Sequence, residues 1–287
     1  PARIRKAGSR EWSQPTRPPH PSGMSESAPS VPRILEGKTG VILGVANKRS
    51  LAWGCARSLA DAGMKLAFTY ANERLKGAVD KLAEECPGSI TLPCDVTQPE
   101  EVTTAFETIG NEFGGLDAMV HAIAFARREE LQGSFFDTSK EGYMLAHEVS
   151  AYSLTAVTRA ALPLMEGREG SIVTLSYLGA DRVVPNYNVM GIAKAALEAS
   201  VRYLAADVGP RGIRVNAVSA GPIRTLSASG VKDFGTMLDR IAEKAPLRRN
   251  VTSEEVGDTC LFLVGPHSRG ITGTTIFVDA GYHVMGL

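Results

Sequence analysis

The sequence has no excess of either charge and no long apolar run. Its 287 residues carry 31 Lys and Arg against 31 Asp and Glu, so no global field would attract nucleic acid or an anionic membrane surface. No stretch approaches the roughly 18 consecutive apolar residues that a membrane-spanning helix needs. The hydrophobic content of 44% is that of an ordinary globular protein, which excludes disorder for most of the chain.

Cysteine is scarce and scattered. The four residues, Cys55, Cys86, Cys94 and Cys260, include no Cys-x-x-Cys pair, which argues against both a zinc site and a disulfide framework. We therefore expect buried apolar cysteines, no metal and a cytoplasmic location.

The first 35 residues lack the apolar core segment of a signal peptide. They are rich in Pro, Arg and Ser and have no helix or strand periodicity. We predict that residues 1–35 are a disordered N-terminal extension. Residues 1–23 are interpreted as a cloning scar or upstream read-through, with Met24 as the natural start.

Residues 36–287 alternate between strand and helix patterns. Short apolar runs bounded by turn residues predict strands at Thr39–Leu43, Lys65–Thr69, Ile90–Leu92, Ala118–Ala122, Ser171–Leu175, Arg214–Val218 and Thr274–Val278. Amphipathic stretches between them predict helices at Leu51–Ala62, Asn72–Glu85, Pro99–Phe113, Lys140–Met165, Asn188–Val208 and Ser253–Val264. The alternation predicts one Rossmann-like, doubly wound parallel sheet of about seven strands with helices on both faces. Ligands of such sheets bind beyond the carboxyl ends of the strands.

The loop after the first predicted strand, GVANKRSLAWG, is suited to a dinucleotide. Gly44 allows a sharp turn close to a pyrophosphate, and Ser50 can cap the next helix and help to bind phosphate at its positive end. Gly54 would let this helix pack closely on its strand. A strand–Gly–helix connection is also common in α/β proteins without a nucleotide.

Two further strand ends strengthen the dinucleotide interpretation. Asp95 follows the third strand with a carboxylate suited to an adenine amino group. Small residues follow His121 at the end of the fourth strand, where a sugar or ring can lie against the backbone.

The segment SYLGADRVVPNYNVMGIAK contains the sharpest catalytic signal. Tyr187 and Lys194 are seven positions apart, about two helical turns, so they share one helix face. The lysine side chain leans back toward the tyrosine, and its ammonium would favour the phenolate and strengthen the phenol as a donor. Gly191 would leave space beside the tyrosine. A solvated helix face is the alternative.

These motifs resemble those of the bacterial NADH-dependent enoyl-acyl-carrier-protein reductases, in the short-chain dehydrogenase/reductase superfamily, from about Leu35 to Tyr282. Tyr-x6-Lys with a second tyrosine, Tyr177, ten residues upstream is specific to that family. Carbonyl reductases of the superfamily have Tyr-x3-Lys, with the lysine four residues after the tyrosine. Here this x3 position of the lysine is occupied by Gly191. The similarity is carried by GVANKRSLAWG, FTY, CDV, the run 121–126, VTLSYLGA, PNYNVMGIAKAALEASVRYLA, GIRVNAVSAGPIRT and VDAGY.

The resemblance implies hydride transfer from NADH to the β-carbon of a trans-2-enoyl thioester, the last reductive step of the fatty-acid elongation cycle. Tyr187 would donate a hydrogen bond to the thioester oxygen, Lys194 would bind the nicotinamide ribose, and Tyr177 would shape the substrate side of the catalytic site. The other implied cofactor contacts are Gly44, Ala46, Ser50, Leu51, Asp95, Val96, Ile123, Ile223 and Thr225. The implied substrate and inhibitor pocket comprises Ala124, Phe125, Ala126, Tyr177, Tyr187 and Met190.

The chain departs from the family pattern at two places. The second strand ends with Thr69-Tyr70-Ala71-Asn72, where NADH-using relatives carry a glutamine that contacts the adenosine. Ala71-Asn72 also lacks the basic pair with which NADPH-using relatives receive a 2′-phosphate, so NADH is favoured over NADPH, although Lys48 and Arg49 lie in the phosphate loop. Ala124 stands where family members commonly have a glycine, in the wall against which diphenyl-ether inhibitors such as triclosan stack.

The resemblance also implies a homotetramer, with the apolar run Val278–Leu287 as a plausible interface, and an acyl-carrier-protein-linked substrate. A substrate lid is predicted around residues 221–245, because this segment begins with Gly-Pro and is then small and polar. Two other functions are weighed: a reductase of another enone or carbonyl compound, and a non-catalytic dinucleotide sensor.

Overall fold

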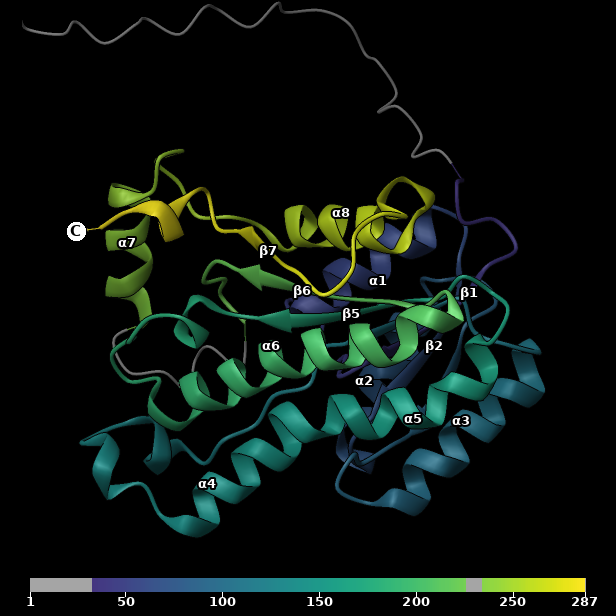
Figure 1. Ribbon diagram of the computed structural model, residues 1–287, viewed down its shortest axis with the longest axis horizontal. Helices are drawn as coiled ribbons and strands as arrows, with labels where there is room; N and C mark the ends of the chain where they lie inside the picture. The colour runs from purple at the N-terminus through teal and green to yellow at the C-terminus, as the bar shows by residue number, and fades with distance from the viewer. Residues whose placement is uncertain (1–32, 226–233, 287) are drawn as a thin grey trace, which may run out of the picture. The chain divides into compact units, whose positions relative to one another are not determined.

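Seven strands form one parallel sheet in the order β3-β2-β1-β4-β5-β6-β7 (Figure 1). The computed structural model describes residues 33–225 and 234–286, so residues 1–32 of the predicted extension and 226–233 of the predicted lid lie outside the described residues. The predicted doubly wound sheet is confirmed, and each strand end lies within two residues of its predicted position. The strands are β1 (Thr39–Leu43), β2 (Lys65–Tyr70), β3 (Ile90–Pro93), β4 (Ala118–His121), β5 (Ser171–Ser176), β6 (Arg214–Ala220) and β7 (Thr275–Val278).

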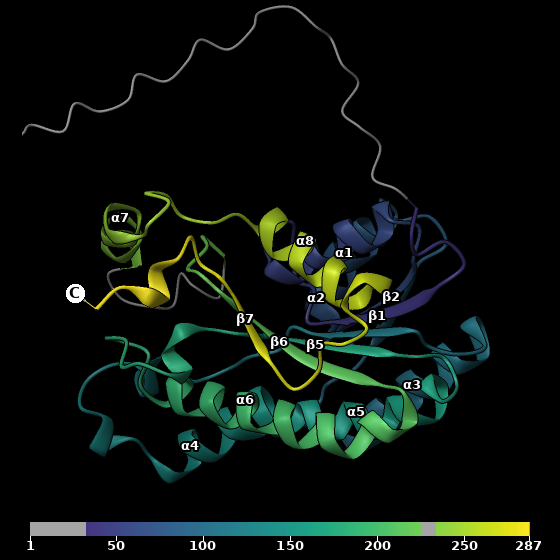
Figure 2. The ribbon, with the colours of Figure 1, turned by 45° about the horizontal axis from the view of Figure 1, so that its top comes forward.

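Helices cover both faces of the sheet because strand side chains alternate between the faces. In β1, Ile42 belongs to one apolar core while its neighbours Val41 and Leu43 belong to the other. The first core is closed by α1 (Leu51–Asp61), α2 (Glu73–Ala83) and α8 (Ser253–Val264); the second by α3 (Pro99–Phe113), α5 (Ser153–Met165) and α6 (Asn188–Val208) (Figure 2). No helix in the described ranges is long and apolar enough to cross a membrane.

Local sequence signals explain where several helices begin and end. The Ser50 hydroxyl accepts a hydrogen bond from the Trp53 N–H at the start of α1, and Pro99 occupies the first turn of α3. Gly63 follows α1 with a φ of 100°, which a residue with a side chain rarely adopts. Thr252 and Glu255 form a reciprocal capping box on α8.

The helix predicted over Lys140–Met165 is interrupted. It consists of α4 (Lys140–His147), a π-helical segment (Glu148–Tyr152) and α5. The prediction of one uniform helix was therefore wrong in its middle. A π turn inserts one extra residue and changes which side chains face the sheet on either side of it.

Gly54 permits a close approach, but its partner is not the strand that the sequence suggested. A Cβ at Gly54 would lie 2.3 Å from the Ser253 carbonyl oxygen, and one at Gly257 would lie 2.4 Å from the Gly54 carbonyl oxygen. Helices α1 and α8 therefore cross with their backbones in contact. This crossing joins the second half of the chain to the helix that follows the phosphate loop.

We expect Gly54→Ala and Gly257→Ala each to lower the free energy of unfolding by about 2–3 kcal/mol, because backbone atoms cannot move away from the added methyl group. Urea denaturation measures this change. Gly77→Ala is the matched control, since no atom lies within 4 Å of the added Cβ in the middle of α2. The control should be neutral or stabilising by up to about 1 kcal/mol. Equal effects at all three positions would contradict the backbone contact.

Candidate active site

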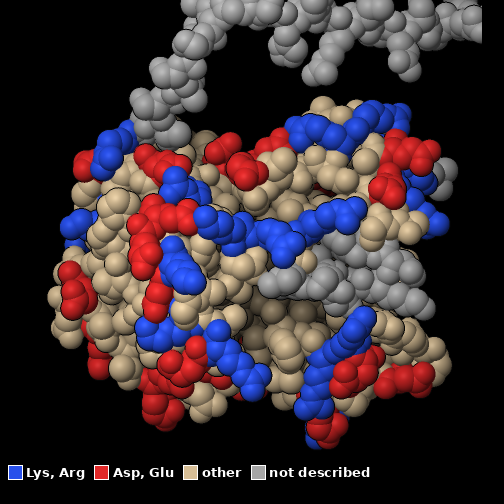
Figure 3. Space-filling model, turned by 180° about the vertical axis from the view of Figure 1, so that it is seen from behind, with Lys and Arg blue, Asp and Glu red and all other residues tan. Residues whose placement is uncertain are grey.

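The carboxyl ends of the seven parallel strands meet at one edge of the sheet, where a ligand site is expected. From behind, the surface has a hollow lined mainly by uncharged side chains, with Lys and Arg side chains along one rim (Figure 3). The hollow lies toward this carboxyl edge. The sequence-predicted site residues follow the ends of β1, β3, β4, β5 and β6 and therefore gather here.

The structure brings Tyr177 and Tyr187 together. Tyr177 directly follows β5, and Tyr187 is the N-cap of α6 rather than a residue within the helix. Their ring centroids are 4.9 Å apart at an interplanar angle of 74°, an edge-to-face arrangement. The Tyr177 hydroxyl donates to the Met237 Sδ of α7 (Phe234–Lys244) at 3.6 Å.

Lys194 lies two turns beyond Tyr187 on α6, and its ammonium is buried. The side chain is 6% exposed, and Nζ donates to the Leu175 carbonyl of β5 at 2.7 Å. Burial lowers the pKa of Lys194 to about 8, and the Glu198 carboxylate opposes this shift. The buried ammonium is thus paired with a carbonyl dipole and has a carboxylate one helical turn away.

Two glycines determine how α6 meets the loop after β5. A Cβ at Gly191 would lie 2.9 Å from the Gly179 carbonyl oxygen, and one at Gly179 would lie 2.5 Å from Cδ1 of Tyr187. The missing side chain at Gly191 therefore lets the loop backbone pack against α6. The missing side chain at Gly179 leaves the space that the Tyr187 ring occupies. No side chain fits at the x3 position, so a Tyr-x3-Lys site is excluded here.

The electrostatic environment of Tyr187 differs from the prediction. Burial, and then the neighbouring Tyr177, raise the pKa of Tyr187 above its ordinary value. The expectation that the lysine would favour the phenolate was wrong, because the desolvation of the phenol outweighs the effect of an ammonium directed at Leu175. Tyr187 is consequently a neutral phenol, and its hydroxyl is a hydrogen-bond donor.

The phosphate loop is held in a tight conformation. Gly44 has a φ of 96°, and a Cβ there would lie 2.4 Å from the Ala122 carbonyl oxygen, so this position requires glycine. The Ser50 hydroxyl donates to the Asn47 carbonyl at 2.7 Å while it caps α1. Ala46 is half-buried, and Leu51 packs against the apolar core. The loop therefore presents the N-terminus of α1 at the carboxyl edge.

The residues predicted for the adenosine side follow β3 and β4. Oδ1 of Asp95 accepts hydrogen bonds from the Thr97 N–H and hydroxyl at 2.9 and 2.8 Å, which orient the carboxylate. Val96 and Ile123 are partly buried against the same apolar core. Ile123 is also within reach of Gly44, because its Cγ1 would lie 3.2 Å from a Cβ there.

The residues that follow β6 are also at this edge. Ile223 is partly buried between the first core and a small cluster of Ala245, Val251 and Ala280. The Thr225 N–H donates to the Ile223 carbonyl at 2.8 Å. Thr225 is the last residue described before position 234.

The predicted substrate and inhibitor wall follows β4. Ala124 and Phe125 are exposed, and Phe125 is 51% exposed. Met190 is buried in a small apolar cluster against which Ala126 and Tyr187 pack. The Ser150 hydroxyl, from the π-helical segment, accepts from the Phe125 N–H at 2.9 Å and donates to its carbonyl at 3.1 Å, which fixes this wall.

The sequence reasoning missed the role of the His121 side chain, which is 1% exposed at the end of β4. Ser153 donates its only hydroxyl proton to the Val149 carbonyl at 2.6 Å, so it accepts from Nε2–H of His121 at 2.8 Å. The Thr174 hydroxyl proton is then shared between Nδ1, at 2.9 Å, and the His121 carbonyl, at 3.1 Å. Burial and the charge of Lys194 lower the pKa of His121 to about 3, so the ring is neutral. A polar histidine among the apolar residues of a predicted buried strand is the signal that would have revealed this network.

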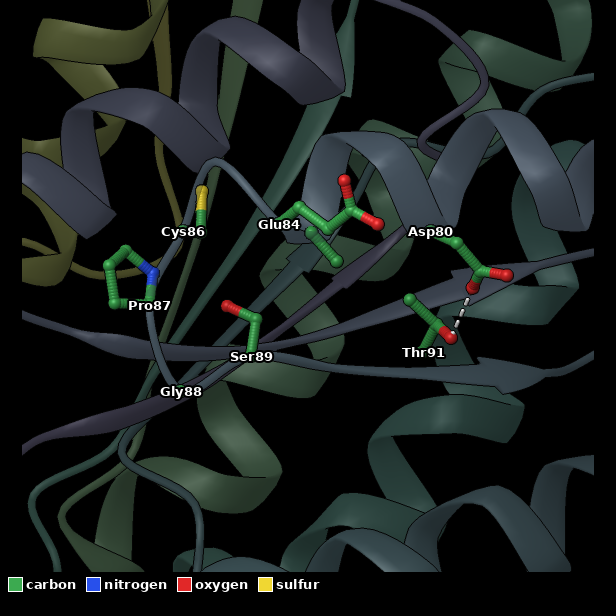
Figure 4. Close-up of a pocket in the computed structure, with 8 residues that line it drawn as sticks. Asp80, Glu84, Cys86, Pro87, Gly88, Ser89 and Thr91 are labelled. Atoms are coloured by element: carbon green, nitrogen blue, oxygen red, sulfur yellow. Dashed lines mark hydrogen bonds between the residues drawn. The ribbon is translucent and has the colours of Figure 1, made fainter.

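Another hollow, of about 330 Å³, lies away from the carboxyl edge, between the end of α2 and the start of β3 (Figure 4). Its residues include Asp80 and Thr91, whose hydroxyl donates to the Asp80 carboxylate at 2.6 Å, and Cys86, whose thiol pKa is raised by burial. A thiol in this state is not an activated nucleophile. Within the described ranges no three His, Cys, Asp or Glu side chains are placed to hold a metal ion.

The neutral His121 ring should make stability depend on pH. Between pH values of about 6.5 and 3 the unfolded imidazole binds a proton that the folded one does not, so the free energy of unfolding should fall as the pH falls through this range. His121→Gln should lose this contribution, at most about 1.4 kcal/mol per pH unit. Denaturation at several pH values measures the slope. His267→Gln, which removes an exposed imidazole, should keep the wild-type slope. The same slope in His121→Gln would refute the buried neutral ring.

Residues 44–283 match the family model described as enoyl-(acyl carrier protein) reductase. The chain is 60% identical over 256 residues to the Bacillus cereus enoyl-[acyl-carrier-protein] reductase named for NADH, covering 88% of this chain and 99% of that protein. It is 53% identical to a Staphylococcus aureus enoyl-[acyl-carrier-protein] reductase named for NADPH, covering 88% of this chain and 98% of the other.

Solved structures give the same result. The B. cereus enoyl-acyl carrier protein reductase, with NADP+ and indole naphthyridinone, has a TM-score of 0.87 and 59% identity over 88% of this chain and 99% of its own. The Aquifex aeolicus enoyl-[acyl-carrier-protein] reductase has a TM-score of 0.86 and 48% identity over 88% and 99% of the two chains. By its sequence and its fold, this chain belongs to the enoyl-acyl-carrier-protein reductase family, within the short-chain dehydrogenase/reductase superfamily.

Proposed function

We propose that this chain reduces the carbon–carbon double bond of trans-2-enoyl thioesters carried on acyl-carrier protein, with NADH as hydride donor. This is the last reductive step of the fatty-acid elongation cycle. The observation that carries the proposal is the edge-to-face pair of Tyr177 and Tyr187, with the buried ammonium of Lys194 two turns further along the helix that Tyr187 caps. The relatives at 50–60% identity named as enoyl-[acyl-carrier-protein] reductases support the same assignment.

The residues at the carboxyl edge fit a dinucleotide. Gly44 and the N-terminus of α1 offer backbone N–H groups to a pyrophosphate, with Ala46, Ser50 and Leu51 lining the loop. Asp95, Val96 and Ile123 would hold the adenosine half. Lys194, Ile223 and Thr225 would hold the nicotinamide half.

NADH is the cofactor that the charge arrangement favours. Ala71 and Asn72, at the end of β2, offer no cation to a 2′-phosphate. Lys48 of the phosphate loop is already paired with Glu85, with Nζ and Oε1 2.5 Å apart. A 2′-phosphate would have to compete with this carboxylate for the ammonium. Comparison of kcat/KM for NADH and NADPH measures the preference.

The mechanism uses the donor character of Tyr187. When bound, NADH supplies a hydride to the β-carbon, which places negative charge on the thioester oxygen. The neutral phenol of Tyr187 donates a hydrogen bond to that oxygen and stabilises the developing enolate. Lys194 would bind and orient the ribose, and its buried ammonium would add a positive charge to the site. Tyr177 restricts the Tyr187 ring and bounds the acyl side.

The alternatives are less well supported by this geometry. A carbonyl reductase of the superfamily needs its lysine at the x3 position, where Gly191 contacts the Gly179 carbonyl. A dinucleotide sensor has no use for a desolvated tyrosine pair. Crotonyl and acetoacetyl thioesters distinguish the enoyl reductase from the carbonyl reductase in one assay.

We further propose a cytoplasmic homotetramer. The cytoplasmic location is supported by the four free, buried cysteines. Val284 and Met285, near the C-terminus, are 65% and 39% exposed, which supports the run Val278–Leu287 as an interface. A hollow of about 510 Å³ lined by Leu247, Phe277, Val278 and neighbouring residues adjoins this run.

The part of the predicted lid that is described comprises Gly221–Thr225 and α7.

Tyr187→Phe should lower kcat for crotonyl thioester about 10²-fold to 10³-fold and leave NADH affinity unchanged, because it removes a donor used only in the transition state. Lys194→Ala should weaken NADH binding and turnover together. Steady-state kinetics and NADH fluorescence titration measure the two effects. Tyr203→Phe, at a 77% exposed position of α6, is the control and should match the wild type. Wild-type kcat in Tyr187→Phe would remove this residue from the site.

Ala124 should weaken diphenyl-ether inhibitors. Its methyl group is exposed on the wall after β4, and it is not among the described residues with positive φ, so a glycine there is not needed for the backbone. A rigid biaryl cannot move around the methyl group as a flexible acyl chain can. Ala124→Gly should therefore lower the triclosan inhibition constant about tenfold, equivalent to roughly 1.4 kcal/mol, with nearly unchanged enoyl turnover. An unchanged inhibition constant would mean that Ala124 does not face the inhibitor.

A further inference from the structure

Two consecutive residues of β5 anchor two residues of α6 that are one helical turn apart. The Leu175 carbonyl accepts from Nζ of Lys194 at 2.7 Å. The next residue, Ser176, is 4% exposed and donates its hydroxyl to Oε1 of Glu198 at 2.5 Å. Lys194 and Glu198 are four positions apart and therefore lie on the same face of α6. The strand end thus anchors a cation and an anion one turn apart on the same face of α6.

A buried ammonium needs compensation. A carbonyl dipole alone does not offset the loss of hydration of a side chain that is 6% exposed. Among the described residues, the titratable groups that interact electrostatically with the Lys194 ammonium are Glu198 on its own helix and His121 from β4. His121 is neutral, so of these two groups Glu198 alone brings a negative charge.

The position of the Glu198 carboxylate is set by the strand rather than by another cation. Arg202, one turn further along α6, donates to the backbone carbonyl of Glu198 at 3.2 Å. The Ser176 hydroxyl is therefore the hydrogen bond that directs the carboxylate inward. Removing either group changes the surroundings of Lys194 without touching a residue assigned to cofactor or substrate.

We propose that Glu198, directed by Ser176, is a positioning residue that keeps the Lys194 ammonium charged and in place for NADH binding. The inference rests on the proposed role of Lys194, but its readout is cofactor affinity and needs no turnover. Burial already lowers the pKa of Lys194 to about 8, and Glu198 opposes the shift. Without this carboxylate the lysine should lose its proton at a lower pH, and NADH affinity should fall from a lower pH upward.

The test is the pH dependence of the NADH dissociation constant, followed by fluorescence between pH 6 and 9.5, in about unit steps. The wild-type protein should bind with constant affinity up to a break near pH 8 and more weakly above it. Glu198→Gln, which keeps an acceptor for Ser176 and removes the charge, should move the break to lower pH. At pH 8 its affinity should be about threefold to tenfold below the wild type, and at pH 6 the two should agree within about twofold.

Three further variants separate charge from structure. Glu198→Asp should restore much of the wild-type profile, because it retains the carboxylate. Ser176→Ala leaves every charge in place and should move the break in the same direction by a smaller amount, about twofold in affinity at pH 8. Asp207→Asn removes an equal charge from an exposed position of α6, about 20 Å along the helix from Lys194, and should leave the profile unchanged.

An unmoved break in Glu198→Gln, or an equal shift in Asp207→Asn, overturns the proposal. If Glu198→Gln does not fold, Ser176→Ala decides the question, and a wild-type profile in that variant overturns it. Lys194→Met should abolish the break altogether; a persistent break would assign it to another group and also overturn the proposal. Failure of the proposed function would appear instead as absence of crotonyl thioester reduction by the wild-type protein, with the NADH profile still measurable.

Discussion

The contact between the end of β5 and helix α6 is the constraint on which the rest of the site depends. A lysine with 6% exposure would not remain charged in an apolar core without compensation, and the Leu175 carbonyl supplies part of it, at 2.7 Å. Because this bond fixes α6 against the strand end, it also fixes Tyr187, the N-cap of the same helix. The rigid sheet thereby sets the position of the phenol.

Glycines fix the backbone around the site by allowing neighbouring segments to come into close contact. At Gly44, Gly179 and Gly191 an added Cβ would lie between 2.4 and 2.9 Å from a neighbouring carbonyl oxygen or tyrosine carbon. Each contact joins segments that are remote in sequence or that turn back sharply. Because these backbones approach each other closely, the chain around the site at the carboxyl edge is tightly packed. A site of this kind is preorganised, because little of it has to move when ligands bind.

The sequence predicted what local physics determines. Strand ends were placed within two residues because alternation and turn residues mark them, and Ser50 and Pro99 marked helix starts through their capping chemistry. The π-helical segment could not be predicted, because Glu148–Tyr152 has an ordinary helical composition and its Ser150 bonds to Phe125, in the loop after β4. Similarly, the partner of Gly54 comes from about 200 residues later in the chain, and the raised pKa of Tyr187 depends on burial that no spacing rule reveals.

Because of the π-helical segment, the structure of this part of the chain depends more on the number of residues in the segment than on which residues they are. Ser150 and Ser153 reach Phe125 and His121 only because one extra residue is accommodated in the turn between α4 and α5. Loss of any one residue there would restore an α-helical turn and rotate one helix against the other by about 100°. Ser150 and Ser153 could then no longer both make their contacts with Phe125 and His121. Substitutions in this segment are local events, whereas a single-residue deletion would alter the wall of the site and the support of the buried histidine at once.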